Sequence, residues 1–166
     1  KSTLLENRFL SAPSWGSNGW ILMNLSDENI YKIKDNGDSL TQLTFSGSNF
    51  GPIWKSDGTQ FCYYHNPTGK AEYYVCDQNG NVTDTLSHCG ISTSWNHSTY
   101  APSTAGGNLL LADVAADSMI DLLDWPIDEG SGYGAVFIDE YNLVFSYKSG
   151  IYKIDIGSKK VTQLKE

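Results

Sequence analysis

Positive charge is scarce in this chain. Lysine and arginine together number 11, against 19 aspartate and glutamate residues, so the net charge is −8. Lys159-Lys160 is the only adjacent basic pair, and no basic stripe exists. A nucleic-acid groove needs clustered lysine and arginine to neutralise phosphates and release their counterions. The composition therefore disfavours nucleic acid as a partner, and it disfavours an anionic membrane surface for the same reason.

Long apolar runs are missing, and cysteine is rare. No stretch approaches the roughly 20 apolar residues of a membrane-spanning helix, so we expect no transmembrane segment. Three cysteines, Cys62, Cys76 and Cys89, leave at least one thiol outside any disulfide. Cys62 and Cys76 fall on two runs that are expected to form a hairpin, so a cross-strand disulfide is conceivable. Buried thiols are the simpler interpretation, because cysteine packs readily as a small hydrophobe.

Common signatures of catalysis and of metal binding are also absent. The sequence holds no Gly-x-Ser-x-Gly, Cys-x-x-Cys or His-Glu-x-x-His, which are typical of hydrolase nucleophiles and zinc sites. Gly130-x-Gly132-x-x-Ala135 resembles a dinucleotide fingerprint, but the run at 136–138 reads as a strand. A phosphate site needs a helix N-terminus there. We therefore predict a protein without catalytic activity, metal or cofactor.

What the sequence does contain is an internal repeat. The tetrapeptide Ile-Tyr-Lys-Ile at residues 30–33 recurs at 151–154, and Thr-Gln-Leu at 41–43 recurs at 162–164, both with an offset of 121 residues. Tryptophans mark intermediate steps of 39 and 41 residues: Trp15, Trp54 and Trp95. A period of about 40 residues is typical of a four-stranded propeller blade. The regular spacing predicts that these tryptophans are core residues between blades.

The segments within each repeat read as strands. They are short runs rich in aromatic and β-branched residues, bounded by turns such as Asp57-Gly58 and Asn79-Gly80, which is a strong hairpin signal. We predict an all-β fold, a β-propeller of about four blade-like repeats with four antiparallel strands each. Residues 1–166 would form a single propeller domain or a segment of a larger propeller, with repeats at about 13–51, 52–92, 93–134 and 135–166.

Several motifs carry a resemblance to a known family. Pro-x-Trp-Lys-Ser-Asp-Gly at 52–58, followed by Glu-Tyr-Tyr-Val at 72–75, resembles the WD40-like propeller repeat of TolB. Gly-Trp-Ile at 19–21, with residues 30–33, is similar to a bacterial β-propeller domain of unknown function. The resemblance implies a fold, not an activity. Because such propellers usually have more blades than four, the repeats would close as four, associate with another chain to complete a propeller, or belong to a longer protein.

The third repeat departs from the pattern. Trp95 keeps its place, but the next apolar run begins only at Leu109, so residues 96–108 are predicted to be an extended loop. Residues 109–114 and 119–125 are predicted strands, whereas 126–134 contain no convincing fourth strand. Breaks in a scaffold pattern favour function. The predicted contact residues are therefore His97, Tyr100, Asp124, Trp125, Asp128, Glu129 and Tyr133.

These observations lead to a function hypothesis with alternatives. The leading hypothesis is a non-catalytic extracytoplasmic scaffold (periplasmic, cell-surface or secreted) that binds a protein or small ligand. The acidity of the third repeat favours a cationic or polar partner. One alternative is a propeller accessory to a prolyl-oligopeptidase-type serine hydrolase, since the same repeat builds those propellers. The other is a carbohydrate-binding propeller, in which exposed aromatic rings stack on sugars. A solvated loop without a role remains a competing interpretation of His97 and Tyr100.

Overall fold

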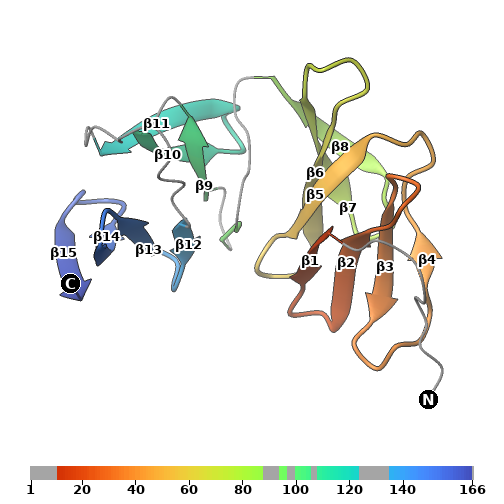
Figure 1. The fold of residues 1–166 in the computed structure, drawn as a ribbon, viewed down its shortest axis with the longest axis horizontal. Coiled ribbons are helices and arrows are strands. Elements are labelled where there is room, and N and C mark those ends of the chain that lie inside the picture. The colour runs from red at the N-terminus through yellow and green to blue at the C-terminus, as the bar shows by residue number, and fades with distance from the viewer. Residues whose placement is uncertain (1–10, 88–93, 97–99, 106–107, 124–134, 166) are drawn as a thin grey trace. The chain divides into compact units, whose positions relative to one another are not determined.

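The computed structural model describes residues 11–87, 94–96, 100–105, 108–123 and 135–165. Every regular element in these segments is a β-strand, as Figure 1 shows, so the all-β prediction is confirmed. No helix that could cross a membrane occurs among these residues. The chain divides into two compact units, residues 1–87 and 88–166.

The first unit contains two four-stranded antiparallel sheets, which we name blade 1 and blade 2. Blade 1 consists of β1 (Ser11–Trp15), β2 (Trp20–Asn24), β3 (Ile30–Lys34) and β4 (Thr41–Gln42). Blade 2 consists of β5 (Asn49–Trp54), β6 (Gln60–His65), β7 (Glu72–Asp77) and β8 (Val82–Leu86). In both sheets the strands lie side by side in sequence order. This simple meander is the arrangement expected of a propeller blade.

The second unit contains blades 3 and 4. The described part of blade 3 has three strands in the order β11-β10-β9: β9 (Tyr100–Ala105), β10 (Asn108–Asp113) and β11 (Ser118–Leu123). Blade 4 is a four-stranded meander of β12 (Ala135–Phe137), β13 (Asn142–Tyr147), β14 (Gly150–Asp155) and β15 (Val161–Lys165). The two copies of Ile-Tyr-Lys-Ile thus both lie on the third strand of a four-stranded sheet.

Blade 3 corrects one sequence-based prediction. An unbroken loop over residues 96–108 is wrong, because residues 100–105 form β9. This strand pairs along its whole length with β10, from Ala105 opposite Asn108 to Tyr100 opposite Asp113. Pro102 is an unfavourable residue for a strand, since proline cannot donate a ladder hydrogen bond. The sheet accommodates it because β9 is an edge strand of the described sheet, where proline is tolerated. Residues 126–134 lie outside the described residues.

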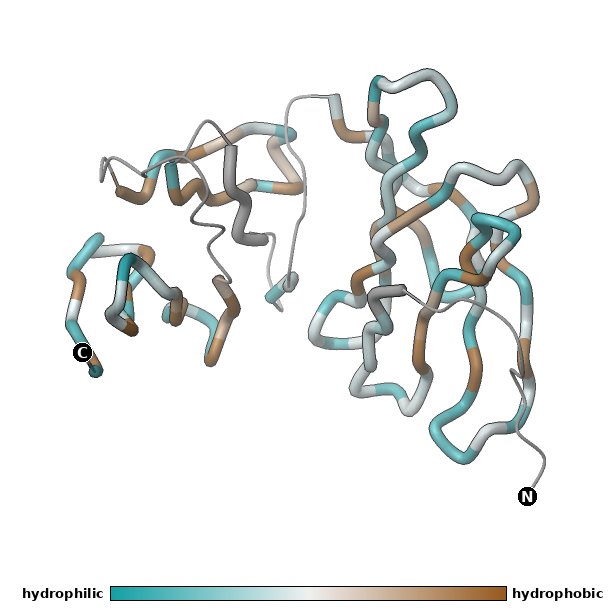
Figure 2. The backbone as a smooth tube through the Cα atoms, in the orientation of Figure 1, coloured by the Kyte–Doolittle hydropathy of each residue, from teal (hydrophilic) through white to brown (hydrophobic). Residues whose placement is uncertain are grey.

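Blades 1 and 2 are held together by a shared apolar core. Side chains on successive strand positions point to opposite faces, so each blade has two faces available for packing. One face of blade 1 meets one face of blade 2, and the buried cluster contains Leu22, Ile30, Leu43, Trp54, Phe61, Tyr63 and Cys76. Figure 2 shows the corresponding alternation of hydrophobic strand segments with hydrophilic turns.

The three repeat tryptophans do not all occupy core positions. Trp54 and Trp95 are each only 4% exposed, as predicted, whereas Trp15 is 69% exposed. The difference lies in what packs over each ring. Trp54 is covered by blade 1, whose strands β1, β2 and β3 lie against β5. No other blade among the described residues covers Trp15 in this way, so the prediction of burial is wrong for this residue.

Hydrogen bonds connect consecutive blades in both units at equivalent places. In the first unit, the Trp54 backbone N–H donates to Ser14 Oγ over 3.0 Å, and Asn18 Nδ2 donates to the Gly58 carbonyl over 2.7 Å. In the second unit, the Phe137 N–H donates to Ser94 Oγ over 3.3 Å. Asn96 Nδ2 also donates to the Glu140 carbonyl over 3.1 Å. These bonds align the first strand of a blade with the preceding blade.

The cysteines of blade 2 are buried thiols on opposite faces of the sheet. Cys62 lies opposite Val75, and Cys76 lies opposite Phe61, so the two sulfurs are directed away from each other. Their exposed fractions are 1% and 0%, which confirms the buried-thiol interpretation. Burial raises the pKa of the Cys76 thiol to about 12. Cys89 lies outside the described residues.

The turn at Gly80 joins the outer part of blade 2 to blade 1. Gly80 has φ of 87°, and a Cβ built on it would lie 2.9 Å from the Leu43 carbonyl oxygen of blade 1. Gly69 has the same φ of 87°, but nothing lies within 4 Å of a Cβ there. The two glycines therefore share a backbone conformation and differ in the space around it.

This pair allows the close packing of blades 1 and 2 to be tested. Gly69→Ala should cost only the left-handed backbone strain, about 1–2 kcal/mol of unfolding free energy. Gly80→Ala should cost about 1–3 kcal/mol more, because the new methyl group overpacks the contact with Leu43. Urea denaturation followed by circular dichroism measures both. Equal losses would contradict close packing at this turn.

Candidate functional site

Most of the contact residues predicted in the third repeat lie outside the described residues. This applies to His97, Asp124, Trp125, Asp128, Glu129 and Tyr133. Tyr100 is the first residue of β9, and its Cα lies opposite that of Asp113. The binding surface predicted on blade 3 therefore stays a prediction. The described residues of the first unit contain a second candidate binding site.

Two connections meet at one end of blades 1 and 2. Residues 25–29 connect β2 to β3, and residues 43–48 connect β4 to β5; we call these two segments the loop platform. The Asn49 backbone N–H donates to the Glu28 carbonyl over 2.9 Å. The Leu43 N–H donates to the Ile30 carbonyl over 2.8 Å. The platform is thus fixed by backbone hydrogen bonds at both ends of its second segment.

Asn49 is the centre of the platform. Its side chain is 1% exposed, and its carboxamide bonds to groups from both segments. Nδ2 donates to the Gly47 carbonyl over 2.8 Å and to Asn29 Oδ1 over 3.2 Å. Oδ1 lies 3.0 Å from His65 Nδ1, and since Oδ1 is an acceptor, His65 Nδ1 is the donor. One buried amide therefore links β5, β6 and both loop segments.

Asn29 and Thr44 extend this network. Thr44 Oγ1 accepts the Ile30 backbone N–H over 2.8 Å and donates to Asn29 Oδ1 over 3.2 Å. The Gly47 N–H also donates to Asn29 Oδ1, over 3.0 Å. Asn29 and Thr44 are both buried. A buried polar network whose members are hydrogen-bonded rigidifies the backbone that it joins.

Two of the six non-glycine residues with positive φ among the described residues belong to the platform. Glu28 has φ of 58° and Ser48 has φ of 55°, a left-handed conformation that is uncommon for residues with a Cβ. The two residues also contact each other, because the Ser48 N–H donates to Glu28 Oε2 over 3.2 Å. Strained residues of this kind persist only where the surroundings determine them, and they cluster at functional sites.

An aromatic side chain projects from this rigid base. Phe45 follows the buried Thr44 directly and is 79% exposed. Burial of a phenylalanine is worth about 1.5–3 kcal/mol, so leaving this ring in water forgoes that stabilisation. An exposed aromatic ring on a preorganised loop has the properties of a recognition anchor, since little entropy is lost when it binds.

The platform carries negative charge. Asp27 and Glu28 are both exposed. Burial acts to raise the pKa of Asp27, but hydrogen bonds from Tyr31 and Asn29 outweigh it and hold the pKa below its usual value. The Tyr31 hydroxyl donates to Asp27 Oδ2 over 2.6 Å. Asp27 therefore stays ionised at neutral pH and presents an anion close to the platform.

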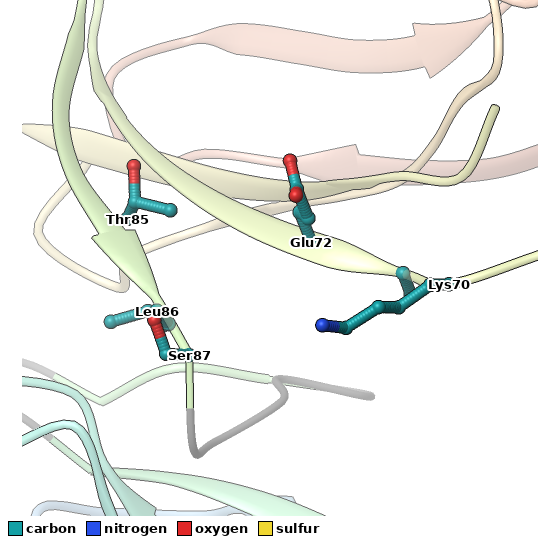
Figure 3. A pocket seen from close by; sticks show the side chains of 6 residues that line it. Lys70, Glu72, Thr85, Leu86 and Ser87 are labelled. Carbon is teal, nitrogen blue, oxygen red and sulfur yellow. The ribbon is translucent and has the colours of Figure 1, made fainter. Parts of the chain in front are cut away.

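A shallow pocket lies at the same end of blade 2. It has a volume of about 120 Å³ and is lined by Lys70, Ala71, Glu72, Thr85, Leu86 and Ser87. Figure 3 shows Lys70 extending from the β6–β7 connection towards the end of β8. The Tyr74 hydroxyl donates to Glu72 over 2.7 Å, and this bond together with burial raises the pKa of Tyr74. The pocket can hold a few waters or one small polar group.

The described residues contain no group of three or more His, Cys, Asp or Glu side chains arranged to hold a metal ion. The platform instead combines one apolar ring, fixed backbone groups and carboxylates. This combination suits the binding of a partner that has both an apolar and a cationic group.

The structure resembles solved β-propellers over nearly its whole length. TolB from Acinetobacter baumannii matches with a TM-score of 0.69 and 18% identity over 95% of this chain and 44% of that chain. A chain of the nidogen/laminin complex matches with a TM-score of 0.65 and 11% identity over 95% of this chain and 64% of that chain. This chain has the fold of the TolB-like and WD40-like β-propellers.

A third propeller extends the comparison. The β-propeller domain of the trilobed protease from Pyrococcus furiosus matches with a TM-score of 0.58 and 13% identity, over 96% of this chain and 58% of that chain. The chain thus spans between 44% and 64% of the length of these three chains. No family model matches it, and no curated protein matches it. At these identities the likeness shows the fold alone.

Sequence reasoning missed the loop platform. Its signal was present in Asn29 and Asn49, but asparagine is also a common residue of tight turns. The bonds that distinguish Asn49 join positions about 20 residues apart, as in its contact with Asn29. The residue pattern within one strand or turn cannot predict a contact between residues so far apart in the sequence. Phe45 carried a weak signal, because it stands in a polar segment, Thr-Phe-Ser-Gly-Ser, between two strands.

The network makes a prediction for Asn49. Asn49→Ala should lower the free energy of unfolding by about 1–3 kcal/mol, because buried polar groups of both loops lose their partner. Hydrogen exchange should also accelerate at the amide of Gly47, which depends on the same network. Asn36→Ala is the matched control, since Asn36 is exposed and bonds only within its own turn through Asp38. Equal effects of the two substitutions would contradict a special role for Asn49.

Proposed function

We propose that this propeller is a non-catalytic scaffold, located outside the cytoplasm, that binds a protein segment through the loop platform. The observation that carries the proposal is the exposed Phe45 ring on a strained, hydrogen-bonded loop. Folding alone gives no reason to hold an aromatic ring in water on such a base. Binding would bury the ring without first having to order the loop.

The chemistry of the partner follows from the charges beside the ring. Asp27 and Glu28 are exposed on the adjoining segment, and the whole chain carries a net charge of −8. A segment that combines an apolar side chain with lysine or arginine would match both features. The residues predicted in the third repeat add further carboxylates, Asp124, Asp128 and Glu129, to the acidic character of the propeller.

Peptide binding tests this proposal. Fluorescein-labelled peptides that alternate leucine with lysine, with serine or with glutamate would be titrated by fluorescence anisotropy. We expect the lysine peptide to bind best and its affinity to fall with added salt, because exposed charges are screened. Phe45→Ser should weaken it at least about tenfold, which is about 1.4 kcal/mol. Leu40→Ser, an exposed apolar residue in a different loop, should bind like the wild type.

The outcomes separate the alternatives. Equal binding by Phe45→Ser and wild type would overturn the loop platform as the site. If Trp125→Ala and Tyr100→Ala weaken binding instead, the surface predicted on blade 3 is the contact. Binding of neutral oligosaccharides in place of the peptides would favour a carbohydrate-binding propeller.

A further inference from the structure

Three Asn-Gly pairs lie in turns of the first unit. Asn18-Gly19 connects β1 to β2, Asn36-Gly37 connects β3 to β4, and Asn79-Gly80 connects β7 to β8. The three glycines have φ of 76°, 89° and 87°. Each glycine N–H donates to the carbonyl three residues earlier, over 3.2, 2.8 and 3.1 Å respectively. Because the backbone of the three turns is closely matched, differences in their chemistry arise from the asparagine side chains.

An asparagine that precedes glycine can lose ammonia without a catalyst. The glycine backbone nitrogen gives up its proton and forms a bond to the asparagine Cγ, the Cγ–Nδ2 bond breaks, and the NH₂ group takes up a proton and leaves as ammonia. Water then opens the resulting succinimide at either carbonyl, which yields aspartate or isoaspartate. Glycine favours the first step because it has no Cβ to hinder the approach. The carboxamide must rotate towards the following nitrogen, so hydrogen bonds that fix the carboxamide slow the reaction.

The carboxamides of Asn18 and Asn36 are fixed by hydrogen bonds. Asn18 Nδ2 donates to the Gly58 carbonyl over 2.7 Å, and Asn18 Oδ1 accepts the Trp20 N–H over 3.1 Å. Asn36 Nδ2 donates to Asp38 Oδ2, and Asn36 Oδ1 accepts the Asp38 N–H, both over 3.0 Å. Asn18 is also partly buried, whereas Asn36 is exposed. Each of these two side chains therefore has to break two hydrogen bonds before it can react.

The side chain of Asn79 is not fixed in this way. Asn79 is exposed, and its carboxamide forms no hydrogen bond among the described residues. Only its backbone takes part in the turn, since the Asn79 N–H donates to Asp77 Oδ1 over 2.8 Å. Asn81 Nδ2 donates to the other oxygen of the same carboxylate over 2.8 Å. The turn is thus held by Asp77 and Asn81, and the Asn79 carboxamide is left to rotate.

We propose that Asn79 is a site of spontaneous deamidation and that this modification weakens the junction between blades 1 and 2. The turn that contains Asn79 contacts blade 1 at two points. A Cβ built on Gly80 would lie 2.9 Å from the Leu43 carbonyl oxygen, and Lys32 Nζ donates to the Gln78 carbonyl over 2.6 Å. Isoaspartate adds one carbon atom to the main chain directly before Gly80, where the space beside Leu43 does not admit even a methyl group.

The change of charge acts in the same direction. Deamidation replaces a neutral carboxamide with a carboxylate two residues from Asp77. Hydrogen bonds from the Asn81 side chain and from backbone amides of the turn hold the pKa of Asp77 below its usual value, so Asp77 is ionised at neutral pH. The two carboxylates repel each other. Both the longer main chain and this repulsion disfavour the turn that contacts blade 1.

Reaction rates in the folded and the denatured protein test the site. Wild-type protein would be incubated in mildly alkaline buffer with and without guanidinium chloride, and the three Asn-Gly peptides quantified by mass spectrometry. In the denatured chain the three rates should be similar, because each asparagine precedes glycine. In the folded protein Asn79 should react at least about tenfold faster than Asn18, since its carboxamide has no hydrogen bond to break. Equal rates at these two residues in the folded protein, or a faster reaction at Asn18, would overturn the proposal.

A variant that does not react tests the consequence. Asn79→Gln keeps a carboxamide but would have to form a larger ring, so it should stay unmodified during the same incubation. Aged wild-type protein should unfold at a lower guanidinium chloride concentration than fresh protein, whereas aged Asn79→Gln should unfold as it does when fresh. An equal decrease in both proteins, or a modified wild type of unchanged stability, would contradict an effect through Asn79.

These measurements are independent of the loop platform. Asp77 lies opposite Gln60 at the start of β6, whereas His65 at the end of β6 bonds to Asn49 of the platform. The Asn79 turn and the platform are therefore at opposite ends of blade 2. Peptide binding by fresh protein reports on the platform alone, and the deamidation rates report on the turn alone.

Discussion

The packing of one blade face on the next is the interaction on which the rest of this structure depends. An isolated four-stranded sheet exposes both of its faces, and burial of apolar surface is the dominant favourable term in folding. Trp54 shows how the sequence meets this requirement, because it contributes a large ring at the end of an inner strand, where the preceding blade covers it. The hydrogen bond from its backbone N–H to Ser14 then fixes the alignment of the two sheets.

The loop platform exists because this junction exists. Asn49 is the first residue of β5, and it reaches the loops of blade 1 only because β5 lies against that blade. The apolar junction places the two backbones, and the buried amides of Asn49 and Asn29 then hold the loops in conformations that local preferences disfavour, as at Glu28 and Ser48. Binding chemistry at the platform is thus a consequence of packing between blades, and the rigidity of the loop around Phe45 has the same origin.

Sequence patterns predicted the parts of this fold that depend on local order. Strand alternation, the turns around Gly58 and Gly80, and the spacing of the tryptophans led to an all-β fold of four blades, because each reports backbone geometry within one repeat. Burial of a repeat residue depends instead on its neighbour, which is why Trp54 and Trp15 share a pattern and differ in exposure. Strand β9 escaped prediction because residues 100–105 form no apolar run. Its Pro102 is acceptable only at a sheet edge, and edge position is a tertiary property.

Residues that stabilise this propeller can be told apart from residues available for recognition by comparing their exposure. The large side chains with almost no exposure, such as Phe61 and Phe145, lie where the fold alone explains them. Phe45, Trp15 and Ile151 are apolar residues that the fold leaves exposed, although Trp54 and Ile30, the repeat counterparts of Trp15 and Ile151, are buried. Exposure of a residue whose repeat counterpart is buried is informative, because the repeat itself shows which contact is missing. Phe45 has no such counterpart, and the evidence for its role is the rigidity of the loop beneath it.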